Sequence, residues 1–207
     1  MVKLIAITDR TLSSQNYWDH MEQIAATNVD GIILREKTLS EEDYTSYAKK
    51  MQRLCNCHQK FCILSHFGRI GIKLHIPRFQ CSISYFQSHT SLSYYMTSLG
   101  VSVHTAEEAR QAEDLGATYI IASHVLPTPC KPDLPPIGLD TLRDICSAVR
   151  IPVYAMGGIT PETLPQLQGI PIAGVCVMTG IMTCEDVPAY VRQLRQAMEK
   201  TKEAVRS

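Results

Sequence analysis

Short apolar runs alternate with longer amphipathic stretches along almost the whole chain. About eight of these runs have the length and continuity of β-strands. They are Lys3–Asp9, Gly31–Lys37, Phe61–Ser65, Ile72–Ile76, Leu99–His104, Tyr119–Ala122, Ile151–Gly158 and Val175–Gly180. Most of them are continuously apolar, which is typical of strands in a parallel sheet that is covered on both faces.

Between these runs, apolar residues recur with the spacing of an amphipathic helix. The sequence predicts helices over Asn16–Thr27, Ser40 to about Leu54, Thr105 to Gly116, Leu139–Val149 and Glu185 to about Lys200. Ser40 and Thr105 are followed by acidic residues, which is a helix-capping signal. A further helix is expected to begin at Thr160-Pro161-Glu162. The link before Ile72 has room for about one helical turn.

This alternation predicts a (β/α)8 barrel, formed by residues 1–207 as a single domain. A chain of 207 residues lies near the lower size limit of that fold, so the connections must be short. An open, doubly wound sheet is the competing architecture. It would carry a glycine-rich fingerprint after the first strand, where this chain has Thr8-Asp9-Arg10-Thr11. The barrel is therefore favoured.

Composition narrows the class of protein. Twenty basic and 20 acidic residues cancel, so nothing indicates a nucleic-acid or polybasic membrane-binding surface. The apolar start is too short for a signal peptide and no run spans a bilayer, so we expect a cytoplasmic protein. The eight cysteines include no CxxC pair, which favours reduced thiols over a metal site. A homodimer is left open.

The strongest candidate for chemistry is His124, which directly follows the run Tyr119–Ala122 in register with Ala122. An imidazole can take up and return a proton near neutral pH. Thr128 and Lys131 nearby can hold an anion by hydrogen bond and charge. The alternative is that His124 is a hydrogen-bonded core histidine and Lys131 a solvated loop charge.

Other polar residues stand where the predicted strands end, which is the active-site face of a barrel. Arg35 and Lys37 share one strand parity, and Ser102 and His104 share another. Glycines follow the seventh and eighth strands, in Gly157-Gly158 and in Met178-Thr179-Gly180. Backbone N–H groups at that place often bind phosphate, although tight turn geometry alone would also explain the glycine pair.

An ordered set of motifs resembles the thiamine-phosphate synthase superfamily from the first strand to the eighth. The motifs are Leu34-Arg35-Glu36-Lys37, Ser102-Val103-His104, Pro127-Thr128-x-x-Lys131, Met156-Gly157-Gly158-Ile159-Thr160 and Gly174-Val175-Cys176-Val177-Met178. The resemblance implies the barrel fold and one of two activities. The synthase joins a pyrimidine diphosphate to a thiazole phosphate and needs Mg²⁺, held by aspartates after strands three and four.

Here the corresponding segments read Leu64-Ser65-His66-Phe67 and Leu74–Phe79, neither of which contains a carboxylate. Mg²⁺ prefers oxygen ligands, so diphosphate chemistry is poorly supported. The synthase pattern also has Gly-Pro where this chain has Ser123-His124. The segment Ser-His-Val…Thr-x-Cys-Lys is instead similar to the thiazole tautomerase branch, TenI, which aromatises a thiazole carboxylate phosphate without a metal or redox cofactor.

The similarity to this branch implies a set of site residues. His124 is the implied proton-transfer residue. Contacts with the substrate and its phosphate are implied for Thr128, Pro129, Cys130, Gly157, Gly158, Met178 and Thr179. The chain departs from the branch at Thr128-Pro129-Cys130, because the residue before the cysteine is more often acidic. This departure concerns the loop contacts.

Three assignments stay open on the sequence alone. Arg35 and Lys37 either hold the substrate carboxylate or are inherited from a diphosphate site. Cys130 is either a second acid–base group or a loop contact through its backbone. The whole barrel, finally, is either an enzyme or a catalytically silent sensor of a thiazole phosphate.

Overall fold

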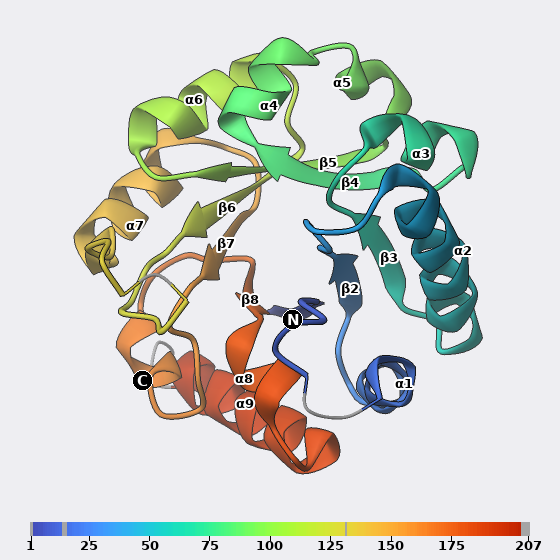
Figure 1. Ribbon diagram of the computed structural model, residues 1–207. Helices are drawn as coiled ribbons and strands as arrows, with labels where there is room; N and C mark the ends of the chain where they lie inside the picture. Colours follow the sequence, from blue (N-terminus) through green and yellow to red (C-terminus); the bar gives the residue numbers. More distant parts are fainter. Residues whose placement is uncertain (1, 14–15, 131, 204–207) are drawn as a thin grey trace.

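The computed structural model describes residues 2–13, 16–130 and 132–203 of the chain. Its strands form a closed barrel in the order β1 to β8, with the helices on the outside (Figure 1). β1 pairs in parallel with β8, from Lys3 opposite Gly174 to Ala6 opposite Val177. This pairing closes the sheet, so the predicted (β/α)8 barrel is confirmed and the open sheet is excluded.

The strands are β1 (Lys3–Ile7), β2 (Gly31–Leu34), β3 (Phe61–Leu64), β4 (Arg78–Ser82), β5 (Ser98–Val103), β6 (Tyr119–Ser123), β7 (Val153–Met156) and β8 (Gly174–Val177). The helices are α1 (Tyr17–Ala26), α2 (Glu41–Cys57), α3 (Gly68–Lys73), α4 (Ile83–Ser88), α5 (Leu92–Tyr95), α6 (Ala106–Asp114), α7 (Gly138–Ala148), the 3₁₀ helix η1 (Leu164–Leu167), α8 (Thr179–Thr183) and α9 (Val187–Glu203). None of the helices in this described part is long and apolar enough to cross a membrane.

The apolar side chains form two layers. The larger layer lies between the strands and the surrounding helices and includes Leu4, Leu34 and Leu64. A smaller cluster fills the barrel interior from the opposite parity, with Ile5, Ile7, Ile33, Ile63, Ile121 and Cys176. Because both faces of each strand are covered, the strands lack the polar alternation of a half-exposed sheet.

The helix caps predicted at Ser40 and Thr105 are present in the structure. The Ser40 hydroxyl accepts from the Asp43 N–H at 3.1 Å, and the Thr105 hydroxyl accepts from the Glu108 N–H at 3.1 Å. Each satisfies an N–H that has no partner inside the helix. These contacts place the starts of α2 and α6 where they were predicted.

The predicted fourth strand is wrong. Residues 68–73 form helix α3, and the segment Ile72–Ile76 runs from the end of that helix into the following turn. The real strand, β4, begins at Arg78. Its inward-facing residues are Arg78, Gln80 and Ser82, so it never forms the apolar run that marks the other strands. The polar lining of the barrel hid this strand from the hydrophobic pattern.

Smaller differences occur where the strands end. β2 stops at Leu34, β7 at Met156 and β8 at Val177, each before the polar residues or glycines that the sequence pattern assigned to the strand ends. Thr179 and Gly180 instead begin the short helix α8. The segment after Thr160 forms only a 3₁₀ helix, Leu164–Leu167. These residues therefore lie beyond the strands, either in loops or at the start of α8.

Candidate active site

His124 lies directly after β6, at the end of the barrel where the strands finish. The residue is buried, with only 4% of its surface exposed. Its Nε2 is 3.2 Å from the carbonyl oxygen of Leu134, in the loop before α7. A carbonyl oxygen only accepts, so this hydrogen bond places the proton of a neutral imidazole on Nε2. Nδ1 is then the unprotonated nitrogen, which has the form that a general base requires.

The register with Ala122 does not determine where the His124 ring lies. Ala122 belongs to the layer between strands and helices, whereas His124 stands beyond the last strand residue, after a cis peptide bond to Ser123. Its surroundings come from the loop. The alternative, a hydrogen-bonded buried histidine, thus accounts for Nε2 of His124. It does not account for Nδ1.

The glycine pair after β7 packs directly against the His124 segment. The Val125 N–H donates to Met156 O at 2.8 Å, and the Leu126 N–H donates to Gly157 O at 3.1 Å. Both glycines have positive φ, +96° at Gly157 and +68° at Gly158. A Cβ on Gly157 would collide with His124 Cβ. Close packing therefore already explains why both residues are glycine.

One side-chain contact joins the loop after β6 to the start of α8. Cys130 Sγ lies 2.9 Å from Thr179 Oγ1, so two residues that are 49 positions apart meet at the mouth of the barrel. Met178 precedes α8 as its N-cap residue. Thr128 is half-buried and Pro129 exposed in the same loop, while Lys131 lies outside the described residues.

Arg35 is held between the ends of β1 and β2. Its Nη1 is 3.1 Å from Asp9 Oδ2, and its N–H donates to Thr8 Oγ1 at 3.0 Å. The Thr8 hydroxyl in turn donates to the buried Glu36 carboxylate at 2.7 Å. Sequence reasoning missed Asp9 and Glu36 as the residues that position Arg35. Lys37 follows them and is exposed.

Ser102 and His104 do not form a common site. Ser102 Oγ accepts from Gln80 Nε2 at 2.7 Å and faces the barrel interior. His104 is exposed, and its Nδ1 is 3.3 Å from Glu108 Oε2 at the start of α6. Gln80 escaped the sequence reasoning because its strand was misplaced. Ser102 therefore lines the barrel interior, whereas His104 contacts Glu108 at the start of α6.

The residues beyond β3 and β4 do not fit the Mg²⁺ site that a synthase needs. β3 is followed by Ser65 and His66, and β4 ends at Ser82 before Ile83, so neither end supplies a carboxylate. Moreover, burial lowers the pKa of His66, and the positive charges of Lys37 and Arg35 lower it further. No group of three or more potential metal ligands occurs among residues 2–13, 16–130 and 132–203.

The closed barrel, with a histidine and a glycine pair beyond neighbouring strand ends, defines the class: a (β/α)8-barrel protein with its candidate site at the C-terminal end of the strands. Within this class, the chain belongs to the thiamine monophosphate synthase family (TMP-TENI), whose profile matches residues 4–181. The superfamily indicated by the sequence motifs is therefore confirmed.

Relatives and solved structures agree with this family. "Thiamine-phosphate synthase 2" of Streptococcus pneumoniae (strain ATCC BAA-334 / TIGR4) is 31% identical over 91% of each chain. "Thiamine-phosphate synthase" of Enterococcus faecalis is 30% identical over 98% of this chain and 97% of the relative. The structure of thiamine phosphate pyrophosphorylase from Pyrococcus furiosus superimposes with a TM-score of 0.84 at 26% identity, over 97% of this chain and 96% of that one.

The structure of KGPDC from Streptococcus mutans superimposes with a TM-score of 0.72 at 12% identity, over 97% of this chain and 99% of that one, which shows the fold alone. The names of the relatives bear on the choice between the two activities. They support the synthase, which is the alternative, more than the thiazole tautomerase.

Proposed function

We propose that this member of the family is a thiazole tautomerase, which aromatises a thiazole carboxylate phosphate by moving one proton. The observation that carries the proposal is the pair of strand ends after β3 and β4. There, Ser65-His66-Phe67 and Ser82-Ile83-Ser84 stand where metal-dependent diphosphate chemistry requires carboxylates. An isomerisation needs a positioned acid–base group instead, and His124 supplies one.

The proposed reaction starts from a ring with a hydrogen on C2, next to the carboxylate, and an exocyclic double bond at C5. Neutral His124 removes the C2 proton through Nδ1, since Nε2 is held by the Leu134 carbonyl. The resulting imidazolium then protonates the exocyclic carbon, and the ring becomes aromatic. One proton leaves and one is added, so the step needs no oxidant and no metal. Acid–base catalysis of this kind contributes about 10² to 10⁴ in rate.

Substrate contacts follow from the loops around His124. Gly157, Gly158, Met178 and Thr179 lie beyond β7 and β8, the usual position of a phosphate site in barrels. The contact between Cys130 and Thr179 holds the loop that carries Thr128 and Pro129 beside this position. In this proposal Cys130 is a loop contact, and Lys131 stays a predicted contact outside the described residues.

Arg35 is the proposed partner of the substrate carboxylate and of the electron-rich intermediate. Its guanidinium is already oriented by Asp9, so it is pre-positioned at the mouth, and Lys37 adds exposed positive charge nearby. Ser102 lies in the barrel lining, so in this proposal it contacts the substrate from there or not at all. His104 is a less favoured contact, because its Nδ1 contacts Glu108 in the first turn of α6.

The second candidate is the synthase, which the names of the relatives favour. A third is a barrel that binds a thiazole phosphate without turnover. One experiment separates all of them. The purified protein is incubated with the non-aromatic thiazole carboxylate phosphate in EDTA, and aromatisation is followed by ultraviolet absorbance. A parallel reaction contains the aromatic thiazole phosphate, the pyrimidine diphosphate and Mg²⁺.

We expect aromatisation in EDTA at a rate that added Mg²⁺ does not change. Release of diphosphate in the parallel reaction, without metal-free aromatisation, would instead identify a synthase. Binding of the thiazole phosphate by calorimetry without turnover in either reaction would identify a sensor.

A further inference from the structure

A cavity of about 120 Å³ opens at the other end of the barrel, where the strands begin. Lys3, Phe61, Arg78, Ser98 and Tyr119 line it, and each is the first residue of its strand. Along β6, five residue steps of about 3.3 Å separate Tyr119 at this end from His124 at the candidate active site, a distance of about 16 Å. Nothing in the proposed function uses this cavity.

Two positively charged side chains line the cavity, and both lie near the ring of Phe61. Lys3 Nζ lies 4.9 Å and Arg78 Cζ 4.5 Å from the centroid of the Phe61 ring. No lining residue is acidic, and neither cation has an ion pair within the described residues. Asp30, directly before β2, accepts from the Leu4 N–H at 2.7 Å, and its charge is paired with Arg195 at 2.7 Å. Two partly desolvated like charges repel one another, so this arrangement favours binding of an anion.

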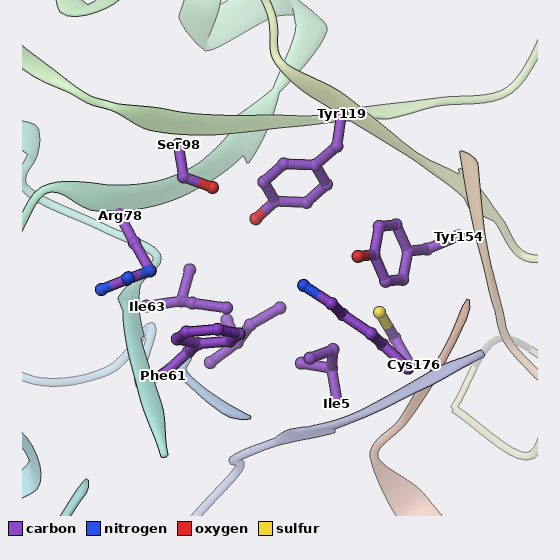
Figure 2. Close-up of a pocket in the computed structure, with 10 residues that line it drawn as sticks. Ile5, Phe61, Ile63, Arg78, Ser98, Tyr119, Tyr154 and Cys176 are labelled. Carbon is purple, nitrogen blue, oxygen red and sulfur yellow. The ribbon is translucent and has the colours of Figure 1, made fainter. Parts of the chain in front are cut away.

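The cavity also presents an unsatisfied hydrogen-bond donor. The hydroxyl oxygen of Tyr119 is buried and has no hydrogen-bond partner among the described residues. Figure 2 shows the hydroxyl groups of Tyr119, Tyr154 and Ser98 directed into the same space. A water molecule could satisfy the hydroxyl, but it would leave the charges of Lys3 and Arg78 unbalanced. An oxyanion does both.

We propose that this cavity binds a small oxyanion of the phosphate or sulfate class. Such an ion accepts from the ammonium, the guanidinium and the hydroxyls at once, while its size matches a space that holds only a few water molecules. The apolar side chains of Ile5, Ile33 and Ile63 close the inner side of the cavity. The ion is either free or the terminal group of a phosphate monoester that enters from the open end.

The test is a titration of the full-length, ¹⁵N-labelled protein with inorganic phosphate, followed by amide chemical shifts. We expect saturable shifts at residues 3, 61, 78, 98 and 119, where the strands begin. Lys3→Met should weaken binding at least about tenfold, because a charged donor is lost. Tyr119→Phe removes a single oxygen and should also weaken binding, so a folding failure in the first variant cannot hide the result.

Lys50→Met is the matched control. Lys50 Nζ lies 4.2 Å from the Trp18 ring centroid on the outside of the barrel, so the same kind of cation–π contact is lost away from the cavity. This variant should bind phosphate like the wild type. A second titration with glycerol 3-phosphate asks about the source of the anion: tighter binding than that of inorganic phosphate indicates a monoester, and weaker binding indicates the free ion.

Two results would overturn the proposal. One is the absence of saturable shifts at the strand starts, which means that the cavity holds only water. The other is a set of shifts confined to residues 157–158 and 178–179, which places the anion at the candidate active site alone. Neither result depends on whether the protein is a tautomerase, since no turnover is measured.

Discussion

The buried carboxylate of Glu36 joins the ends of β1 and β2, and its neutralisation by Glu36→Gln gives a sharp test of the structure. Oε1 accepts from the Thr8 hydroxyl at 2.7 Å and the Tyr17 hydroxyl at 3.1 Å, while Oε2 accepts from the Arg10 N–H at 3.1 Å. Desolvation raises the pKa of Tyr17, and the charge of Glu36 raises it further, so the phenol stays a donor at neutral pH. All three partners therefore require an acceptor.

Glutamine supplies only one acceptor oxygen. If this oxygen keeps both hydroxyls, the amide nitrogen faces the Arg10 N–H, and one charge-assisted hydrogen bond is lost. Such a bond contributes about 1.5–3 kcal/mol. We therefore expect Glu36→Gln to lower the free energy of unfolding by about 2–3 kcal/mol, and the Tm by about 4–12 °C for a chain of this length.

Urea unfolding followed by circular dichroism measures this loss. Glu199→Gln is the control: Glu199 is exposed on α9, and its substitution should change stability by no more than about 0.5 kcal/mol. A loss of similar size in the two variants would refute the role of Glu36 as the anchor of these strand ends.

Three further predictions concern packing, catalysis and pH. In urea unfolding, Gly158→Ala should lower the free energy of unfolding by about 1–3 kcal/mol more than Gly138→Ala. Both glycines have positive φ, but only at Gly158 would a Cβ meet neighbouring atoms, with a carbonyl oxygen 2.5 Å away. Equal losses in the two variants would contradict this reasoning. Arg35→Ala should lower kcat by about 10-fold or more with a smaller rise in KM, whereas Arg143→Ala on α7 should change neither; a pure KM effect would demote Arg35 to substrate binding. The lowered pKa of His66 means that the unfolded chain binds its proton more readily, so stability should fall as pH drops below about 6.5; His66→Gln should flatten that fall in thermal melts, and an unchanged pH profile would contradict it.

The barrel could be predicted from the sequence because most of its strands are apolar on both faces. The pattern failed at β4, where Arg78, Gln80 and Ser82 line the barrel and break the apolar run. Helix starts were predictable where one short side chain forms the cap, as at Ser40. Such signals are local, and so the sequence records them directly.

The candidate site was predictable only in part. His124 stood out because a titratable residue follows a buried run, but its contact with Leu134 depends on the path of a loop and has no sequence signal. The same holds for the meeting of Cys130 with Thr179 across 49 positions. Gly157 and Gly158 appeared to mark a phosphate site, yet their packing against the His124 segment is an independent reason for both. The features of the site that the sequence pattern could not predict are long-range contacts between irregular segments.

The most direct test of the central claim is the rate of metal-free thiazole aromatisation by His124→Gln. Glutamine can keep the hydrogen bond to the Leu134 carbonyl but cannot carry the proton. We expect kcat to fall at least about a hundredfold, with a Tm and a product affinity close to those of the wild type. His89→Gln, an exposed histidine on the outside of the barrel, serves as the control and should retain full activity. More than about a tenth of the wild-type kcat in His124→Gln would contradict the role of His124 as the proton carrier.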